Sequence, residues 1–202
     1  DYDWLQNKYP FAGVLVWYLF IFVLGVFAYP IARLALPGLK QYAYPLGRIV
    51  GLVLLAWMAW MGGSVGVPYT RVSISVAFVI IAVAGVGLWM KRREEFKEDW
   101  DSNRRFFVIA EIVFLTFFLI DLLIRLGNSD MWHPAKGGER PMDFSYFNAV
   151  LRSTSFPPYD PWFAGGYINY YYYGFVLAGT PVKLLGIVPS IAYNFILPTW
   201  FA

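Results

Sequence analysis

The carboxylates of one long polar stretch, residues 127–166, are the side chains whose types and spacing best suit chemistry. Four of the 13 acidic residues lie there: Asp130, Glu139, Asp143 and Asp160. A carboxylate held in place can act as a general base, and a group of carboxylates can bind a hard divalent cation. We therefore predict Asp143, Asp160 and Glu139 as catalytic candidates and a divalent cation as a candidate cofactor. Spacing alone leaves open whether the three converge.

Asp143 lies at the start of the stretch MDFSYFNAVLRS. Its apolar side chains recur at the three- and four-residue spacing of an amphipathic helix, at Phe144, Phe147, Val150 and Leu151. Pro141 favours a helix start, which would put Asp143 at or near the N-cap. We expect a short helix along the outer membrane surface that presents Asp143 as a base or metal ligand. The simpler alternative is that Asp143 only caps this helix.

Aromatic side chains crowd the following stretch, PPYDPWFAGGYINYYYYG. Four consecutive tyrosines, Tyr170 to Tyr173, would point in all directions on a helix, so they cannot form one stacking surface. The pattern is typical of an interfacial aromatic belt at head-group level. The alternative is that one or two of the hydroxyl groups, together with Asn169, hydrogen-bond a polar substrate. His133, in the same loop, is expected to be an ordinary loop residue.

Composition identifies the kind of protein that must position these residues. Of 202 residues, 59% are hydrophobic and only 14% are charged, whereas a soluble domain carries about 25% charged residues. The apolar residues come in long blocks, so this is an integral membrane protein. A soluble enzyme domain, a disordered chain and a nucleic-acid binder are excluded, and the lack of cysteine excludes disulfides and thiolate metal sites.

The apolar blocks predict an all-α polytopic bundle of about six transmembrane helices, because about 20 apolar residues cross a bilayer as a helix. The expected segments are 11–36, 46–61, 72–90, 105–126, 167–185 and a run that begins at 187. The chain then divides into a four-helix region, 1–126, a loop with a surface helix, 127–166, and helices five and six, 167–202. The last helix reads as incomplete, and we expect the chain to be a portion of a longer protein.

Basic residues predict the orientation in a cell membrane. Nine of them fall on one side of the predicted spans: Arg33, Lys40, Arg48, Lys91, Arg92, Arg93, Lys97, Arg104 and Arg105. That side should be cytoplasmic and the loop 127–166 extracytoplasmic. Residues 91–105 are then a solvated cytoplasmic loop, with a partner's docking site as the alternative. Lys183 should lie near the inner end of the fifth span.

Three charged residues fall inside the fourth span, where charges are costly and need partners. Asp121 and Arg125 are four residues apart on one helix face and can pair directly. Glu111 is expected to pair with a basic residue of a neighbouring helix.

The loop string GGERPMDFSYFNAVLRSTSFPPYDPWFAGGYINYYYYG resembles the signature of the YYY-type multi-pass membrane proteins, a family of unknown function. That family in turn resembles the GT-C glycosyltransferases, which use isoprenoid-phosphate-linked sugars outside the membrane. The resemblance implies that Asp143, followed by Phe144 and Tyr146, is the catalytic acidic residue. For such an enzyme we expect substrate-binding roles for five residues: Arg140, Tyr146, Arg152, Asn169 and Tyr170.

A non-catalytic helical subunit of a larger membrane complex is the competing interpretation. Small residues such as Gly51, Ala56 and Ala59 permit close helix contact, which suits assembly. The expected partners are membrane lipids, an isoprenoid-phosphate sugar and other membrane subunits, and no nucleic acid.

Overall fold

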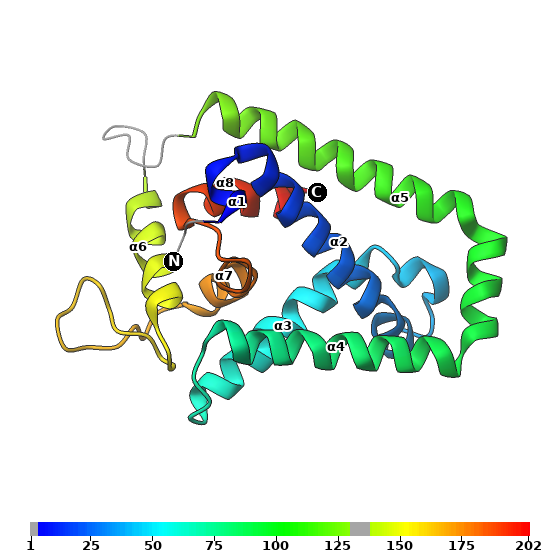
Figure 1. Ribbon diagram of the computed structural model, residues 1–202, viewed down its shortest axis with the longest axis horizontal. Coiled ribbons are helices and arrows are strands. Elements are labelled where there is room, and N and C mark those ends of the chain that lie inside the picture. Colours follow the sequence, from blue (N-terminus) through cyan, green and yellow to red (C-terminus); the bar gives the residue numbers. More distant parts are fainter. Residues whose placement is uncertain (1–3, 130–137) are drawn as a thin grey trace.

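The computed structural model describes residues 4–129 and 138–202, and their regular elements are all helices (Figure 1). They are α1 (Leu5–Lys8), α2 (Pro10–Ala35), the 3-10 turn η1 (Lys40–Ala43), α3 (Leu46–Ser64), α4 (Arg71–Lys91), α5 (Arg93–Gly127), α6 (Arg140–Arg152), α7 (Tyr173–Leu185) and α8 (Pro189–Phe201). Asp130 and His133 lie outside the described residues, so the expectations for them stay predictions.

Within the described ranges, four helices, α2 to α5, are long and apolar enough to cross a membrane. The predicted polytopic helical bundle is thereby confirmed. The segments expected at 167–185 and from 187 form α7 and α8, of 13 residues each. Residues 167–172 precede α7, so of the four consecutive tyrosines only Tyr173 is helical, which corrects the picture of a tyrosine helix. Backbone bonding explains this, because the amide of Ile168 donates to the carbonyl of Pro158 and holds the segment extended.

Small residues let the spanning helices approach closely. A Cβ added at Gly47 would lie 2.6 Å from the carbonyl oxygen of Gly25, and one at Gly85 would overlap the carbonyl oxygen of Phe27. The backbones of α3 and α4 therefore touch the backbone of α2 directly, as small residues allow between membrane helices. Ala56 and Ala59 are buried in the same core.

The charged run 91–105 is helical, which corrects the expectation of a loop. It forms the start of α5, where Glu94 and Glu95 in the first turn suit the positive end of the helix. The backbone leaves helical geometry at Asn103, with φ −130° and ψ 20°, and the apolar part of α5 follows. In Figure 1 the chain turns sharply between α4 and α5, at the right of the view.

Two ends of the molecule follow from this layout. We call residues 36–45 together with 91–104 the corner end, and residues 64–71 together with 138–187 the loop end. They lie at the right and the left of Figure 1. The helices α3 and α4 run between them in opposite directions.

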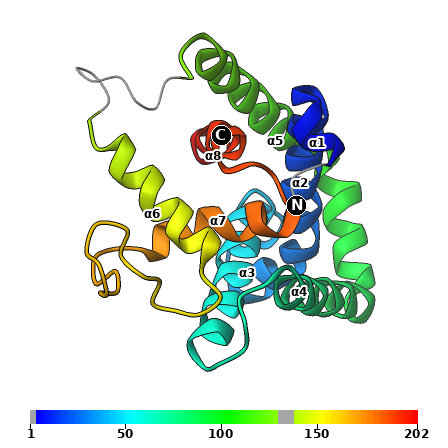
Figure 2. The same cartoon turned by 60° about the vertical axis from the view of Figure 1, so that its left-hand side comes forward.

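The helices α6 and α7 build most of the loop end, where they pack on each other (Figure 2). The predicted amphipathic helix is confirmed as α6, whose Phe147 and Val150 are fully buried. Both ends of α7 contact the loop-end parts of α3 and α4: the Tyr172 hydroxyl accepts a bond from Trp60, and the Lys183 carbonyl accepts one from Arg71. Lys183 thus lies beside the first residue of α4, which corrects its expected place at the opposite side of the membrane.

Candidate functional site

Asp143 lies in the first turn of α6, and the N-cap is Glu139. Asp143 thus lies near the N-cap, as expected, but the alternative that it is itself the capping residue is wrong. Its amide donates to the Glu139 carbonyl at 2.9 Å, so the helix has already begun when the chain reaches Asp143. No residue in the described ranges hydrogen-bonds its carboxylate. Burial, and then the nearby charge of Glu139, raise the pKa of Asp143 above its ordinary value.

Two tyrosines surround this pair of carboxylates. Tyr193 of α8 packs its ring against Phe144 and Phe147 of α6, with ring centroids 5.8 and 6.0 Å away. Tyr171 feels the charges of Asp143 and Glu139, and its pKa is raised first by a hydrogen bond with Tyr170 and more weakly by these charges. Asp143 therefore lies within electrostatic range of two phenolic side chains.

Cationic groups lie beside the same region. Tyr193 feels the charges of Asp143, Arg125 and Arg140 together, so these four residues share one neighbourhood. Arg125 donates from Nε and Nη2 to the side-chain oxygen of Asn194, at 3.1 and 2.7 Å. The predicted Asp121–Arg125 pair is not formed, because the buried guanidinium points to α8 instead. Sequence reasoning missed the Asn194 partner, although a buried cation inside a predicted span signals that an acceptor must lie nearby.

Asp160 does not join this group. Its Oδ1 accepts from the Trp162 amide at 2.8 Å and its own amide donates to the Gly166 carbonyl, so it closes a turn in the loop. Its charge acts on Tyr146 rather than on Asp143. Across residues 4–129 and 138–202, no group of three or more His, Asp or Glu is arranged to hold a metal ion.

The five residues predicted to bind substrate are spread along α6 and the segment before α7. Arg140 begins α6 beside Asp143, whereas Arg152 ends α6 and lines a separate cavity of about 520 Å³. The two arginines are about 18 Å apart along the helix, so they do not serve one phosphate group. Tyr146 is buried against Phe175.

The ring of Tyr170 contacts that of Tyr171, with centroids 4.0 Å apart and planes tilted by 45°, while Asn169 is exposed. Of the predicted set, then, Arg140 begins the helix that carries Asp143, and Tyr170 contacts Tyr171, whose pKa responds to the charges of Asp143 and Glu139. Tyr171 is one of the four tyrosines whose hydroxyl groups are candidates for hydrogen-bonding a substrate, whereas Tyr193 is a site residue that the sequence did not single out.

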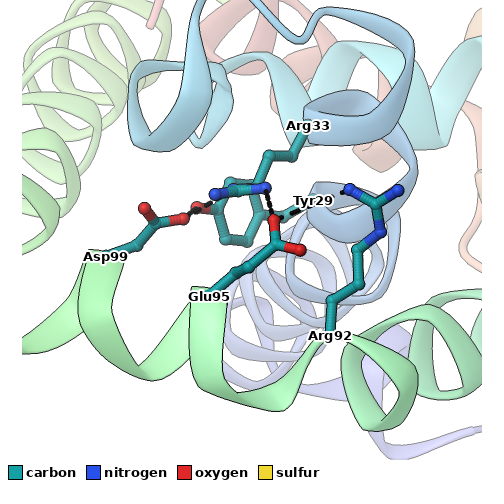
Figure 3. A network of polar contacts seen from close by, with 5 residues as sticks. All are labelled: Tyr29, Arg33, Arg92, Glu95 and Asp99. Carbon is teal, nitrogen blue, oxygen red and sulfur yellow. Dashed lines mark hydrogen bonds and ion pairs between the residues drawn. The ribbon is translucent and has the colours of Figure 1, made fainter.

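The charges at and next to the corner end form a different arrangement. Glu111 accepts hydrogen bonds from Tyr44 at 2.6 Å and Arg48 at 2.5 Å, which confirms its predicted pairing with a basic residue of another helix. Arg33 of α2 binds two carboxylates of α5, Asp99 at 2.6 Å and Glu95 at 2.9 Å (Figure 3).

These pairs lie beside an apolar cavity of about 780 Å³ between α2, α4 and α5. We assign the pairs to holding the helices together, because each joins α5 to α2 or α3 or to the turn between them.

The fold and the apolar helices define a polytopic helical membrane protein. Residues 54–202, about three quarters of the chain, match the family of uncharacterized membrane proteins DUF2298. The chain belongs to this family. Comparison with curated proteins and with solved structures found no match.

Proposed function

We propose that this protein is a GT-C-like glycosyltransferase that moves a sugar from an isoprenoid phosphate to a hydroxyl acceptor at the loop end. The supporting observation is the Asp143 carboxylate: it is partly buried, bound by no donor among the described residues, and close to Glu139. A carboxyl group with a raised pKa is a better base than an ordinary one. The likeness of the loop to the YYY-type proteins is part of this proposal.

In the proposed reaction, Asp143 accepts the proton of the acceptor hydroxyl. The acceptor oxygen forms a bond to the anomeric carbon of the sugar while the bond from that carbon to the lipid phosphate oxygen breaks. The electron pair of the broken bond leaves with the phosphate. Arg140, one turn before Asp143, balances the charge of this leaving group.

The remaining residues position the substrates. Tyr171 and Tyr193 offer hydroxyl groups beside Asp143, and Glu139 tunes its basicity. Asp160, Tyr146, Asn169 and Tyr170 would contact the part of the acceptor that extends along the loop. The distribution of Lys and Arg favours a cytoplasmic corner end and an extracytoplasmic loop end.

The test is donor consumption in vesicles. The protein is reconstituted with polyprenyl-phosphate sugars carrying radiolabelled glucose or mannose, and release of label from the lipid phosphate is measured. Asp143→Asn should slow release by about 100-fold or more, the usual contribution of a general base. The control is Asp101→Asn, an exposed carboxylate of α5 remote from the loop end. Equal rates for Asp143→Asn and the native protein would refute the proposal.

A non-catalytic helical subunit remains the second candidate, favoured by the surface of α5. Only 17% of its most apolar window is buried in the chain, so most of this helix is free to pack against other membrane helices. If the protein is such a subunit, the native protein should not consume the polyprenyl-phosphate sugar donor. It also predicts that apolar-to-Trp changes on the exposed face of α5, such as Ile112→Trp, abolish co-purification of a membrane partner.

A further inference from the structure

A second polar cavity of the loop end, of about 310 Å³, lies where α4 begins and α7 ends. Its polar lining comes from Thr70, Arg71, Thr154 and Lys183, and its apolar lining includes Leu151 and Ile187. It lies beyond the end of α6 opposite to Asp143, so it is distinct from the site described above. Two cationic side chains share this small space.

Lys183 is fixed in the cavity by neutral groups. Its Nζ donates to the Ser153 carbonyl at 2.7 Å and lies 4.2 Å from the centroid of the Tyr69 ring. That ring is completely buried, and its hydroxyl is hydrogen-bonded to Thr180 at 3.0 Å. The ammonium has three N–H donors, and one is used by the carbonyl. The amine is therefore held in one place with donor capacity left over.

Arg71 is held in the same way. Its Nε donates to the Lys183 carbonyl at 3.2 Å, and its guanidinium lies 5.0 Å from the Trp4 ring centroid. The guanidinium occupies the space where a Cβ of Gly186 would stand, so only glycine leaves room for it. Gly186 also has a φ of +64°, which favours glycine. The two terminal nitrogens of Arg71 stay available to a ligand.

Neither cation has an acidic partner. In the described part of the chain, no carboxylate forms an ion pair with Arg71 or Lys183, whereas Arg33 and Arg48, next to the corner end, pair with two carboxylates and one carboxylate respectively. Two like charges in one half-buried cavity repel each other and lose hydration, and an anion between them would offset both costs. Arginine and lysine together are typical phosphate ligands.

We propose that Arg71 and Lys183 bind the phosphate group of a phosphate ester. The apolar wall formed by Leu151 and Ile187 would contact the organic part of that ester. The phosphate chemistry is common to the head group of an anionic lipid and to a soluble phosphate, and the experiment separates these two sources.

The test uses the full chain in phosphatidylcholine nanodiscs with two probes, dioleoyl phosphatidic acid in the bilayer and inorganic phosphate in the buffer. Binding is followed by the rise in the thermal unfolding midpoint as each probe is titrated. Lys183→Met and Arg71→Gln should each weaken binding at least tenfold. Lys91→Met, an exposed lysine at the last residue of α4, should not change it.

A glycine pair supplies a second, independent test. Gly186→Ala forces the Arg71 guanidinium to move. Gly66→Ala also places an alanine at a positive φ, +98°, but its Cβ meets open space. Binding should fall with Gly186→Ala and persist with Gly66→Ala.

A response to phosphatidic acid alone identifies a lipid head group as the source, and a response to inorganic phosphate identifies a soluble phosphate. The proposal is overturned if neither probe binds, or if Lys183→Met and Arg71→Gln bind as the native protein does. None of these readouts needs transfer activity, so they stand apart from the proposed function.

Discussion

The corner end and its adjoining helices differ from the loop end in how charges are neutralised. Arg33 and Arg48 each bind a carboxylate of α5. At the loop end, Lys183 and Arg71 are held by backbone carbonyls, and Arg125, on the last turn of α5 nearby, is held by the amide oxygen of Asn194.

This difference separates charges that hold helices together from charges that are available to a ligand. An ion pair between helices fixes their positions, and its charges are already neutralised. A cation held only by neutral oxygens is not neutralised, so its charge remains available to an anionic ligand. The same holds for Asp143, whose carboxylate has no donor in the described ranges.

The largest stability effect is expected at Arg48. Arg48→Met leaves the carboxylate of Glu111 with Tyr44 alone, inside the membrane-spanning part of the bundle. Removing one partner of such a pair should lower the free energy of unfolding by about 3 kcal/mol, measured by equilibrium unfolding in mixed micelles. The double variant Arg48→Met/Glu111→Gln should recover much of this loss, because no unpaired charge remains. A double variant that loses as much as the sum of both single variants would contradict the role of the pair.

A smaller loss is expected at Arg33, which lies in the last turn of α2 and pairs with the charged first part of α5. Arg33→Gln should cost about 2 kcal/mol, because Asp99 is left in a largely buried position. The matched control is Arg92→Gln, which breaks an exposed pair with Glu95 at 3.6 Å. That change should cost less than about 0.5 kcal/mol. If Arg33→Gln and Arg92→Gln lower the free energy of unfolding equally in this assay, the buried pair is no more stabilising than the exposed one, and the prediction fails.

The loop end should behave in the opposite way. Lys183→Met removes a partly desolvated ammonium and keeps an apolar side chain of similar length, and it leaves no carboxylate unpaired. The free energy of unfolding should therefore change by less than about 0.5 kcal/mol in the absence of a ligand. A loss above about 2 kcal/mol would place Lys183 among the structural charges instead.

The smallest effect concerns the pH dependence at Asp143. Because burial and Glu139 raise the pKa of this carboxyl in the folded state, the folded protein binds the proton more tightly than the unfolded chain. Stability from this group is therefore present at low pH and decreases as pH rises through the window between the unfolded and the folded pKa. Asp143→Asn should lack this decrease, so its unfolding midpoint relative to the native protein should rise from acid to neutral pH. A difference that is constant with pH would contradict the raised pKa.

Much of the fold could be predicted from the sequence, since long apolar blocks have sharp boundaries. The predicted segments 11–36 and 72–90 match α2 and α4 to within one residue at each end. The first part of α5 escaped prediction because its charged residues give no apolar periodicity.

The site could be predicted only in outline. Spacing along a helix identifies possible neighbours four residues away, such as Asp121 for Arg125, but it does not report a partner on another helix. Asn194 lies 69 residues from Arg125, and Tyr193, on α8, is within range of the charge of Asp143 on α6. Glu139 and Asp143 are neighbours because they lie four residues apart at the start of α6. The separation of Asp160 from them involves the turn at 160–166, which no periodicity reveals.

The most direct test measures two properties of Asp143→Asn in one preparation: release of sugar from a labelled polyprenyl-phosphate donor, and the unfolding midpoint at neutral pH. If the loop-end charges serve chemistry, release should fall by about 100-fold or more while the midpoint stays at or above that of the native protein. A midpoint that falls while release per folded molecule is unchanged would make Asp143 a structural residue and contradict the account.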